Sequence, residues 1–366
     1  AGYFSYLKRY NEDGGFWYSN GTSMSNGGSV SEISPLANTL LTWEKGRKVN
    51  VGLDLTLLKN RLTLSADYYN DYYYDILQSR GKSIQLLGIA YPAENIGKTR
   101  YYGLETQLSW QDHIGKVNYY VSANWSMEQN KRLFMDEQYV PYDYLKMTGQ
   151  PTGTIYGLVA TGFLTAKDIA DGYPVMNGFN NIQAGDVKYK DQNGDNRIDE
   201  KDVVKMFGSS VPRFYFGFNL NFSYKRLELS ADFQGMTGVT VSLLNSPLYS
   251  PLVSNGNISN TFLNEEISWT PENKTNATMP RLTTQENLNN YRASSLWYRD
   301  GSFLKLRNLL VAYTFPKSQT RFADLKVFVQ GTNLFSLDNI HFADPEQLGI
   351  AYPSTRSYWA GIKLNF

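Results

Sequence analysis

The chain has 366 residues, and its 35 lysines and arginines against 34 aspartates and glutamates leave a net charge of +1 at pH 7. This balance gives no reason to expect a nucleic-acid partner. No run of about 18 apolar residues occurs, which excludes a membrane protein built of helices. Cysteine is absent, which fits a periplasm-exposed protein but excludes little.

Aromatic residues are unusually frequent, with 28 tyrosines, 19 phenylalanines and 7 tryptophans making up 15% of the chain. Tyrosine and tryptophan suit the two edges of a bilayer, because one side of the ring is dry and the other meets water. The first seven residues lack the basic start and apolar core of a signal peptide. We expect them to form a strand reaching about Tyr10, and the chain to be the carboxyl-terminal piece of something longer.

Seven further segments alternate apolar and polar residues with the period of a strand whose two faces differ. Their apolar sets are Val51, Leu53, Leu55 and Leu57; Leu62, Leu64, Ala66 and Tyr68; Tyr102, Leu104, Leu108 and Trp110; Tyr119, Val121, Ala123 and Trp125; Phe216, Phe218, Leu220, Phe222 and Tyr224; Leu227, Leu229, Ala231 and Phe233; and Leu325, Val327 and Val329.

Two more segments complete a set of ten predicted strands. The stretch near 302–315 is strand-like, although Lys305, Arg307 and Asn308 break its alternation. The last ten residues, 357–366, alternate cleanly and end on Phe366. Ten tilted residues at about 3.3 Å each are the length of a strand that crosses a membrane.

The connections between these strands alternate in length. Short ones fall at about 58–61, 111–115, 225 and 316–322, and long ones at about 77–98, 129–210, 241–300 and 334–355. Outer-membrane barrels have this arrangement because their periplasmic turns are tight and their outward loops are large. We therefore predict an all-β fold, a transmembrane antiparallel β-barrel, with large outward loops at the four long connections.

In such a barrel the apolar sets face lipid and the polar sets face a wet or plugged lumen. The polar sets include the carboxylates Asp54, Asp67, Glu105, Glu228 and Asp232. No two of them are close enough in sequence to assign as general acid and base, so we expect a protein that is not an enzyme. An outer-membrane protease or lipase and a soluble carbohydrate-binding β-sandwich remain as alternatives.

One motif carries recognisable chemistry, a calcium-loop candidate at residues 191–202. Its oxygen donors would be the side chains of Asp191, Asn193, Asp195, Asp199 and Asp202 and the backbone carbonyl of Arg197. A hard cation takes six to eight oxygens, and the odd-numbered spacing points them inward. Asn196 replaces the usual glycine at the sixth position and Asp202 the usual glutamate at the twelfth. The role of the ion would be structural; the alternative is a metal-free turn held by side-chain to backbone hydrogen bonds.

Other candidate residues give weak signals. The two histidines, His113 and His341, lie in a predicted short turn and a predicted outward loop, so they cannot share a zinc ion. The loop aromatics could stack on sugar rings, although packing within the loops is the simpler interpretation; they are Tyr249, Trp269, Tyr291 and Trp297.

A series of short segments resembles the carboxyl-terminal barrel region of SusC/RagA-like TonB-dependent transporters of the Bacteroidota outer membrane. The segments, in chain order, are 41–44, 50–54, 60–62 with 67–69, 95–97 with 102–105, 185–191, 208–209 with Pro212, 216–218, 233–235, 304–308, 331–335, 344–346 and 352–353. Each is a weak signal alone, but their order is fairly specific.

The resemblance implies a 22-stranded barrel whose lumen holds an amino-terminal plug, of which this chain supplies about ten strands. It implies import of a large nutrient, a glycan fragment or a peptide, with energy from TonB and a SusD-like surface lipoprotein as a lid. The plug and the TonB-contacting segment would not be present in this chain. Phe366 would be the signal that the barrel-assembly machinery reads. The substrate-binding residues stay unknown, and a complete small pore or adhesin barrel is the alternative function.

Overall fold

The computed structural model describes residues 6–11, 15–19, 21–28, 31–32, 36–81, 91–179, 181–244, 267–283, 287–340, 343–347, 352 and 354–366. The chain divides into two compact units. The first comprises residues 1–50, 69–102 and 129–152, and the second comprises residues 51–68, 103–128 and 153–366. No helix in the described ranges is long and apolar enough to cross a membrane.

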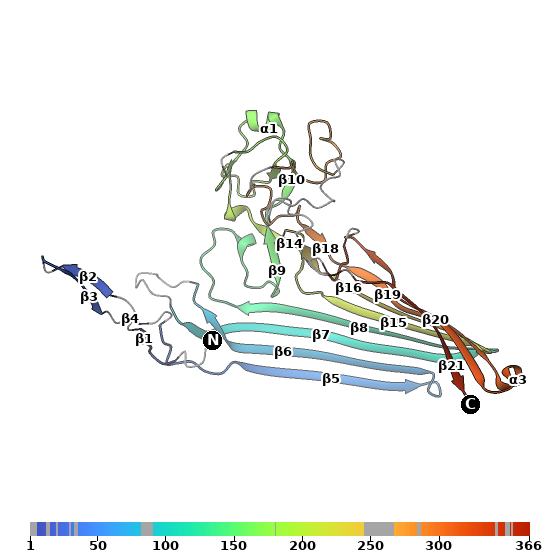
Figure 1. Ribbon diagram of the computed structural model, residues 1–366. Coiled ribbons are helices and arrows are strands. Elements are labelled where there is room, and N and C mark those ends of the chain that lie inside the picture. The colour runs from blue at the N-terminus through green and yellow to red at the C-terminus, as the bar shows by residue number, and fades with distance from the viewer. Residues whose placement is uncertain are drawn as a thin grey trace. The chain divides into compact units, whose positions relative to one another are not determined.

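Nine antiparallel strands form the main sheet, in the hydrogen-bonded order β21-β20-β19-β16-β15-β8-β7-β6-β5, and the second unit contains part of every one (Figure 1). The strands are β5 (Lys45–Leu57), β6 (Leu62–Ser79), β7 (Ala93–Ile114), β8 (Val117–Phe134), β15 (Phe214–Tyr224), β16 (Leu227–Thr237), β19 (Phe303–Phe315), β20 (Asp324–Asp338) and β21 (Ser357–Asn365). This confirms the predicted all-β class and nine of the ten predicted strands.

The tenth predicted strand, at the start of the chain, is wrong over its described part. Residues 6–9 form no strand, and Tyr10 belongs to the two-residue β1 (Tyr10–Asn11), which pairs with β4 (Ser31–Glu32) outside the main sheet. Residues 1–5 lie outside the described residues. The consecutive charges of Lys8 and Arg9 interrupt the alternation that a membrane strand needs. The first unit also contains the hairpin of β2 (Gly15–Ser19) and β3 (Met24–Gly28).

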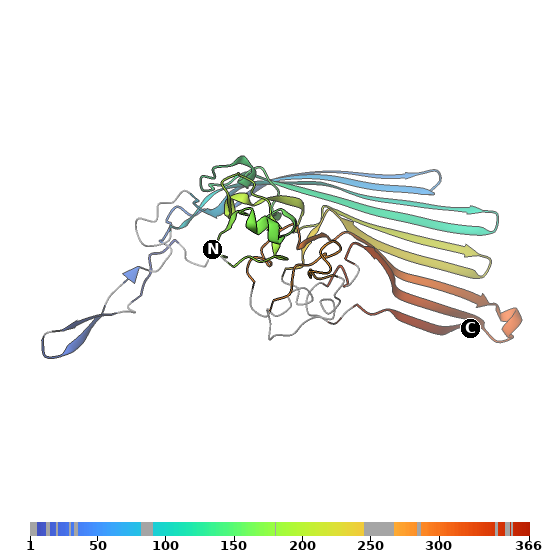
Figure 2. The same cartoon turned by 90° about the horizontal axis from the view of Figure 1, so that it is seen from above.

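The short connections all lie at one end of the second unit's sheet, which we call the short-turn end (Figure 2). They are residues 58–61, 115–116, 225–226 and 316–323, the last containing α3 (Lys317–Thr320). Gly115 and Lys225 have φ of 61° and 55°, the left-handed conformation that tight hairpin turns require. Asn365 pairs with Asp324 just after the last turn, so β21 also ends at this side.

The longer connections of the second unit leave the opposite end of its sheet, and three strands are longer than the alternation indicated. β6 continues to Ser79, β7 begins as early as Ala93, and β8 continues to Phe134. Their outer parts are rich in tyrosine and charge and no longer alternate. Strand pairing needs only backbone groups, so the sheet continues past the region where a lipid face imposes a pattern.

The register places apolar residues opposite apolar residues across three central strands. Phe218 of β15 lies opposite Phe233 of β16 and Ala123 of β8, and Asn219 opposite Asp232 and Ser122. In the described structure the apolar face is open: Leu53, Phe218 and Ile362 are 50%, 42% and 69% exposed. We call this face the outward face, and the polar one the lumen face.

The irregular stretch in β19 is a β-bulge. Phe233 pairs with Leu306 but Asp232 with Asn308, so Arg307 is the extra residue. On the other side, Leu306 pairs with Phe335 and Asn308 with Thr332, and Asn333 adopts a φ of 51°. The extra residue shifts the phase of the strand, which explains why its faces look mixed in the sequence.

The long connections 135–213 and 238–302 contain strands and helices of their own. The parts of these connections that belong to the second unit, residues 153–213 and 238–302, we call the loop subdomain. Its elements are β9 (Thr154–Gly157), β10 (Ala160–Phe163), α1 (Ala166–Ala170), β11 (Val175–Met176), β12 (Val187–Tyr189), β13 (Arg197–Ile198), η3 (Glu200–Asp202), β14 (Val204–Ser209), β17 (Thr240–Ser242) and β18 (Tyr298–Asp300). Residues 245–266 and 284–286 are outside the described part.

We expect the outward face to tolerate no charge. Phe218→Arg in the intact protein should destabilise the folded barrel by about 2–4 kcal/mol, the cost of arginine near the middle of a bilayer on a barrel's lipid face. Urea titration of folding into lipid vesicles measures this. The matched control is Ser122→Arg. Ser122 precedes Ala123, the residue of β8 that pairs with Phe218, and therefore lies on the lumen face. Equal losses in both variants would contradict the assignment of the two faces.

Candidate functional site

The lumen face carries a connected set of polar side chains. The Asn219 side-chain amide donates to Asp232, and the Asn308 amide donates to the other oxygen of Asp232 at 3.3 Å. Nearer the short-turn end, Lys326 forms an ion pair with Glu228 at 2.5 Å. Asp232 and Glu228, two of the carboxylates predicted to face the lumen, are thus held by side chains of other strands in the sheet.

A more concentrated site lies at the bulge of β19, where two cations meet two carboxylates. Lys305, only 4% exposed, forms ion pairs with Asp344 and, at 2.6 Å, with Glu346. Arg307 donates to Glu346 at 2.5 Å and to Gln234 at 2.9 Å. Three of the segments quoted for the family resemblance, 304–308, 331–335 and 344–346, therefore meet at one place.

Both carboxylates of this cluster are held ionised. Burial alone would raise the pKa of Asp344, but hydrogen bonds from Lys305, Ser354 and the Glu346 N–H outweigh it and lower that pKa. Burial likewise opposes ionisation of Glu346, and Arg307 and Lys305 together lower its pKa. At neutral pH the cluster is therefore a fixed set of paired charges that clamps the loop 343–347 to the sheet.

Beside the cluster is a pocket of about 430 Å³, which we call the bulge pocket. Lys305, Asn333, Ser336, Asp338, Asp344, Ser354 and Arg356 supply its polar lining, and Phe335, whose ring contacts Phe233, also borders it. Arg356 is exposed and forms no ion pair with another described residue. A cation, amide and hydroxyl donors and one ring suit a polar ligand with an anionic or hydroxyl-rich group. The sequence alone gave no signal for this pocket, because Arg356 belongs to no motif.

The loop subdomain has two small hydrophobic cores. One gathers Leu158, Met176, Val187, Tyr189 and Ile198, and the other Leu243, Met279 and Trp297. Trp297 is fully buried and its ring stacks on Tyr291 with centroids 5.2 Å apart. Trp269 packs so closely on Gly185 that a Cβ there would overlap its ring. These aromatics therefore serve internal packing, while Tyr249 lies outside the described residues.

A buried carboxylate, Asp186, ties distant parts of this subdomain together. Its side chain is fully buried and accepts from Arg281 at 2.6 Å, Asn287 at 3.0 Å and Asn290 at 3.1 Å. The backbone N–H of Gln183 donates to its other oxygen at 2.8 Å. Sequence reasoning placed Asp186 in a family segment but missed this role, because its partners follow it by about a hundred residues.

The predicted calcium loop is wrapped tightly on itself. Asp191 accepts from the N–H groups of Gly194 at 2.7 Å and Asn196 at 2.8 Å, and Asn196 has a φ of 63°, as a substitute for glycine must. The fully buried Asp202 accepts from the backbone N–H groups of Gln192 at 2.7 Å and Asp199 at 2.9 Å.

The remaining loop side chains also bond to the backbone. Asn193 accepts from the Asp195 N–H at 2.9 Å, Asp195 from the Arg197 N–H at 3.0 Å, and Asp199 from the Lys201 N–H at 2.8 Å. Within the described residues no three acidic or histidine side chains are grouped as a metal site. The loop thus closes through its own hydrogen bonds, and a calcium ion stays a prediction.

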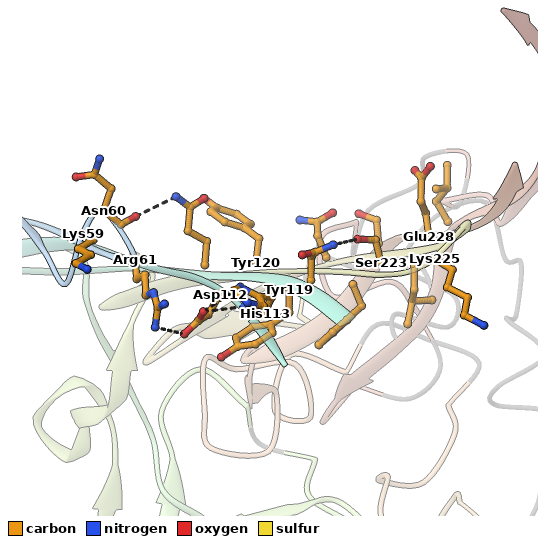
Figure 3. A pocket seen from close by; sticks show the side chains of 17 residues that line it. Lys59, Asn60, Arg61, Asp112, His113, Tyr119, Tyr120, Ser223, Lys225 and Glu228 are labelled. Carbon is orange, nitrogen blue, oxygen red and sulfur yellow. Dashed lines mark hydrogen bonds and ion pairs between the residues drawn. The ribbon is translucent and has the colours of Figure 1, made fainter. Parts of the chain in front are cut away.

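A second pocket, of about 780 Å³, lies at the short-turn end, and we call it the rim pocket. Figure 3 shows Arg61, Asp112 and Tyr119 on one side of the sheet and Ser223 and Glu228 on the other. Arg61 pairs with Asp112 at 3.0 Å. His113 is exposed at this pocket, as predicted, but it belongs to the end of β7 and not to the turn that the sequence indicated. His341 lies outside the described residues. Phe366 is 93% exposed, and its role in assembly stays a prediction.

We predict that Asp186 holds the loop subdomain together. Asp186→Ala would leave Arg281 and two buried amides without their acceptor, a change that costs about 3–5 kcal/mol for a buried pair. Hydrogen exchange of peptides covering β12 and residues 287–297 should show lost protection. Asp143→Ala, which breaks an exposed ion pair with Lys146, is the control and should change little. Unchanged protection in the Asp186 variant would contradict the structural role.

Comparison with known proteins agrees with this architecture. Residues 2–334 match the family described as TonB dependent receptor-like, beta-barrel. TonB-dependent receptors P3 and P26 of Formosa agariphila are 27% and 25% identical, over 91% and 90% of this chain and 35% of each relative. The chain therefore spans about a third of the length of these relatives.

Solved structures share the fold. The RagAB peptide importer in its open-open state matches with a TM-score of 0.67 and 22% identity, over 100% of this chain and 38% of that chain. Its closed-closed state matches with a TM-score of 0.64 and 23% identity, over 98% and 38%. The family is one of receptors and transporters of the outer membrane, which are not enzymes. The chain belongs to the TonB-dependent receptor β-barrel family and forms part of an outer-membrane β-barrel protein.

Proposed function

We propose that this chain is part of the barrel of a transporter that imports a large nutrient, a peptide or a glycan fragment, across the outer membrane in a TonB-dependent way. The observation that carries the proposal is the bulge pocket, which opens on the lumen face beside the long-loop end of β19 and β20. Its lining is built from three strand and loop segments clamped by ion pairs. A substrate entering the lumen from the long-loop side would meet these groups.

The remaining parts of the machine would come from outside the chain. A plug elsewhere in the longer protein would gate the lumen and receive energy from TonB, and a SusD-like lipoprotein would cover the long loops. The solved RagAB structures are described as those of a peptide importer, which supports a peptide as the first cargo to test. Arg356 would then receive a peptide carboxylate, because arginine pairs with carboxylates through two parallel hydrogen bonds.

The alternative, a complete small pore or adhesin barrel, is less favoured. Within the described residues, β5 and β21 are the two edges of the sheet, each paired on one side only. A sheet edge exposed to lipid leaves backbone groups unsatisfied, at several kcal/mol each. This cost supports the proposal that further strands complete the barrel.

Uptake measurements test the proposal. Cells expressing the intact protein should accumulate labelled peptides, and inactivation of TonB should abolish this uptake; a simple pore would conduct without TonB. Arg356→Ala should lower the uptake of peptides with a free carboxylate on the order of tenfold, since a hydrogen bond to a charged group contributes about 1.5–3 kcal/mol. Lys274→Ala, which removes an exposed cation of the loop subdomain, is the control.

The outcomes separate the cargo classes. The cargo would be a glycan if the unaltered protein imported oligosaccharides but no peptides, and if the Arg356 variant lost the oligosaccharide uptake. Uptake of both classes that is unchanged in the variant would show that the bulge pocket does not bind cargo.

We further propose that the loop 191–202 takes a structural calcium ion. The support is its donor spacing and the tight turn around Asn196, and the ion would add to hydrogen bonds that already close the loop. Calcium at a hundredfold excess over its dissociation constant should then stabilise the loop by about 2.7 kcal/mol. Hydrogen exchange with calcium or with a chelator measures this.

The double variant Asp191→Asn with Asp195→Asn should lose the calcium response. Asp171→Asn, an exposed aspartate at the end of α1, is the control and should keep it. A loop that is equally protected with calcium and with chelator in the unaltered protein would end the calcium proposal and leave the transport proposal intact.

A further inference from the structure

The four short turns carry cations and no acidic residue. Their seven basic residues are Lys59, Arg61, Lys116, Lys225, Arg226, Lys317 and Arg321, and neither aspartate nor glutamate occurs in residues 58–61, 115–116, 225–226 or 316–323. The whole chain is balanced, with 35 basic and 34 acidic residues. The positive charge is therefore a local property of the turns themselves, while Asp112 and Asp324 lie on the strand ends beside them.

These cations are available to a partner. All seven side chains are exposed. Arg61 pairs with Asp112 at 3.0 Å, and the other six form no ion pair with any residue that the structure describes. Like charges gathered on one surface repel each other, and an anion placed against them relieves this repulsion.

The aromatic residues next to these turns mark the level at which they lie in a membrane. The Lys225 ammonium sits 5.3 Å from the ring centre of Tyr224, the last residue of β15. On the outward face nearby, the Trp110 indole donates to the Tyr119 hydroxyl at 3.1 Å. Such rings occupy the boundary between hydrocarbon and headgroups, and lysine and arginine beyond them extend to the headgroups.

The orientation of two cations agrees with this level. Figure 3 shows Arg61 and Lys225 on the same side of the sheet as Tyr119, opposite to Glu228. Tyr119 lies opposite Phe222 in the register, so this is the outward face. The cations therefore flank the lipid-facing surface.

We propose that the short-turn end binds the anionic headgroups of phospholipids in the leaflet that surrounds it. Phosphodiester groups at this level would lie within reach of Lys59, Lys225 and Arg226. Their negative charge would also balance the positive charge of the turns. A soluble acidic partner fits less well, because it would have no use for the aromatic and apolar surface directly beside the charges. The proposal is independent of the cargo.

Native mass spectrometry of the intact protein, released from nanodiscs of equal parts phosphatidylglycerol and phosphatidylcholine, tests this. The unaltered protein should retain phosphatidylglycerol in excess. Equilibration in 0.5 M salt should reduce this excess, because salt at this concentration shortens the electrostatic screening length to about 3–8 Å. The double variant Lys225→Gln with Arg226→Gln should lower the ratio of phosphatidylglycerol to phosphatidylcholine retained by roughly 25-fold, at about fivefold for each cation.

Two further variants control for charge and for folding. Lys167→Gln with Lys274→Gln removes two exposed cations from the loop subdomain and should leave the ratio unchanged. Lys225→Arg with Arg226→Lys keeps the charge and should keep the preference. Equal retention of both lipids by the unaltered protein, or an equal fall in the loop control, would overturn the proposal. Tight binding of soluble polyglutamate without any lipid preference would overturn it in favour of an acidic partner.

Discussion

The structure depends on one constraint: a backbone that crosses hydrocarbon must satisfy every N–H and C=O group within the protein. Antiparallel pairing does this strand by strand, and β15 shows it most fully, with eleven consecutive partners in β16 and eleven in β8. Because each strand then has one lipid face and one lumen face, its side chains must alternate. The outward apolar set and the lumen carboxylates both follow from this pairing.

The same constraint determines where specific chemistry can occur. With the outward face committed to lipid, polar recognition is confined to the lumen face, the long loops and the two ends of the sheet. The bulge at Arg307 lets β19 depart from strict alternation, so that Lys305 and Arg307 both reach Glu346 on the lumen face. A local irregularity of one residue thus builds the clamp beside the bulge pocket.

The loop subdomain follows soluble-protein rules instead. Its described part has only two small apolar clusters, and buried polar contacts join them to the rest of the subdomain. Asp186 gathers four donors from three segments, and the Tyr189 hydroxyl donates to the Asn289 carbonyl at 2.6 Å. Buried hydrogen-bond networks of this kind specify one arrangement of otherwise irregular chain.

The sequence by itself determined the fold class, the positions of nine strands, the faces of Leu53, Phe218 and Ile362, and the alternation of short and long connections. These features are local, since period-two alternation and turn length are properties of neighbouring residues. The tertiary structure alone decided the bulge, the clamp of Lys305 by Asp344 and Glu346, the Asp186 network and the outer extensions of β6 to β8. In the sequence a bulge looks like a broken alternation, and strand pairing beyond the bilayer leaves no alternation to detect. Partners that lie 39 to 104 residues apart meet only when the strands between them are in register.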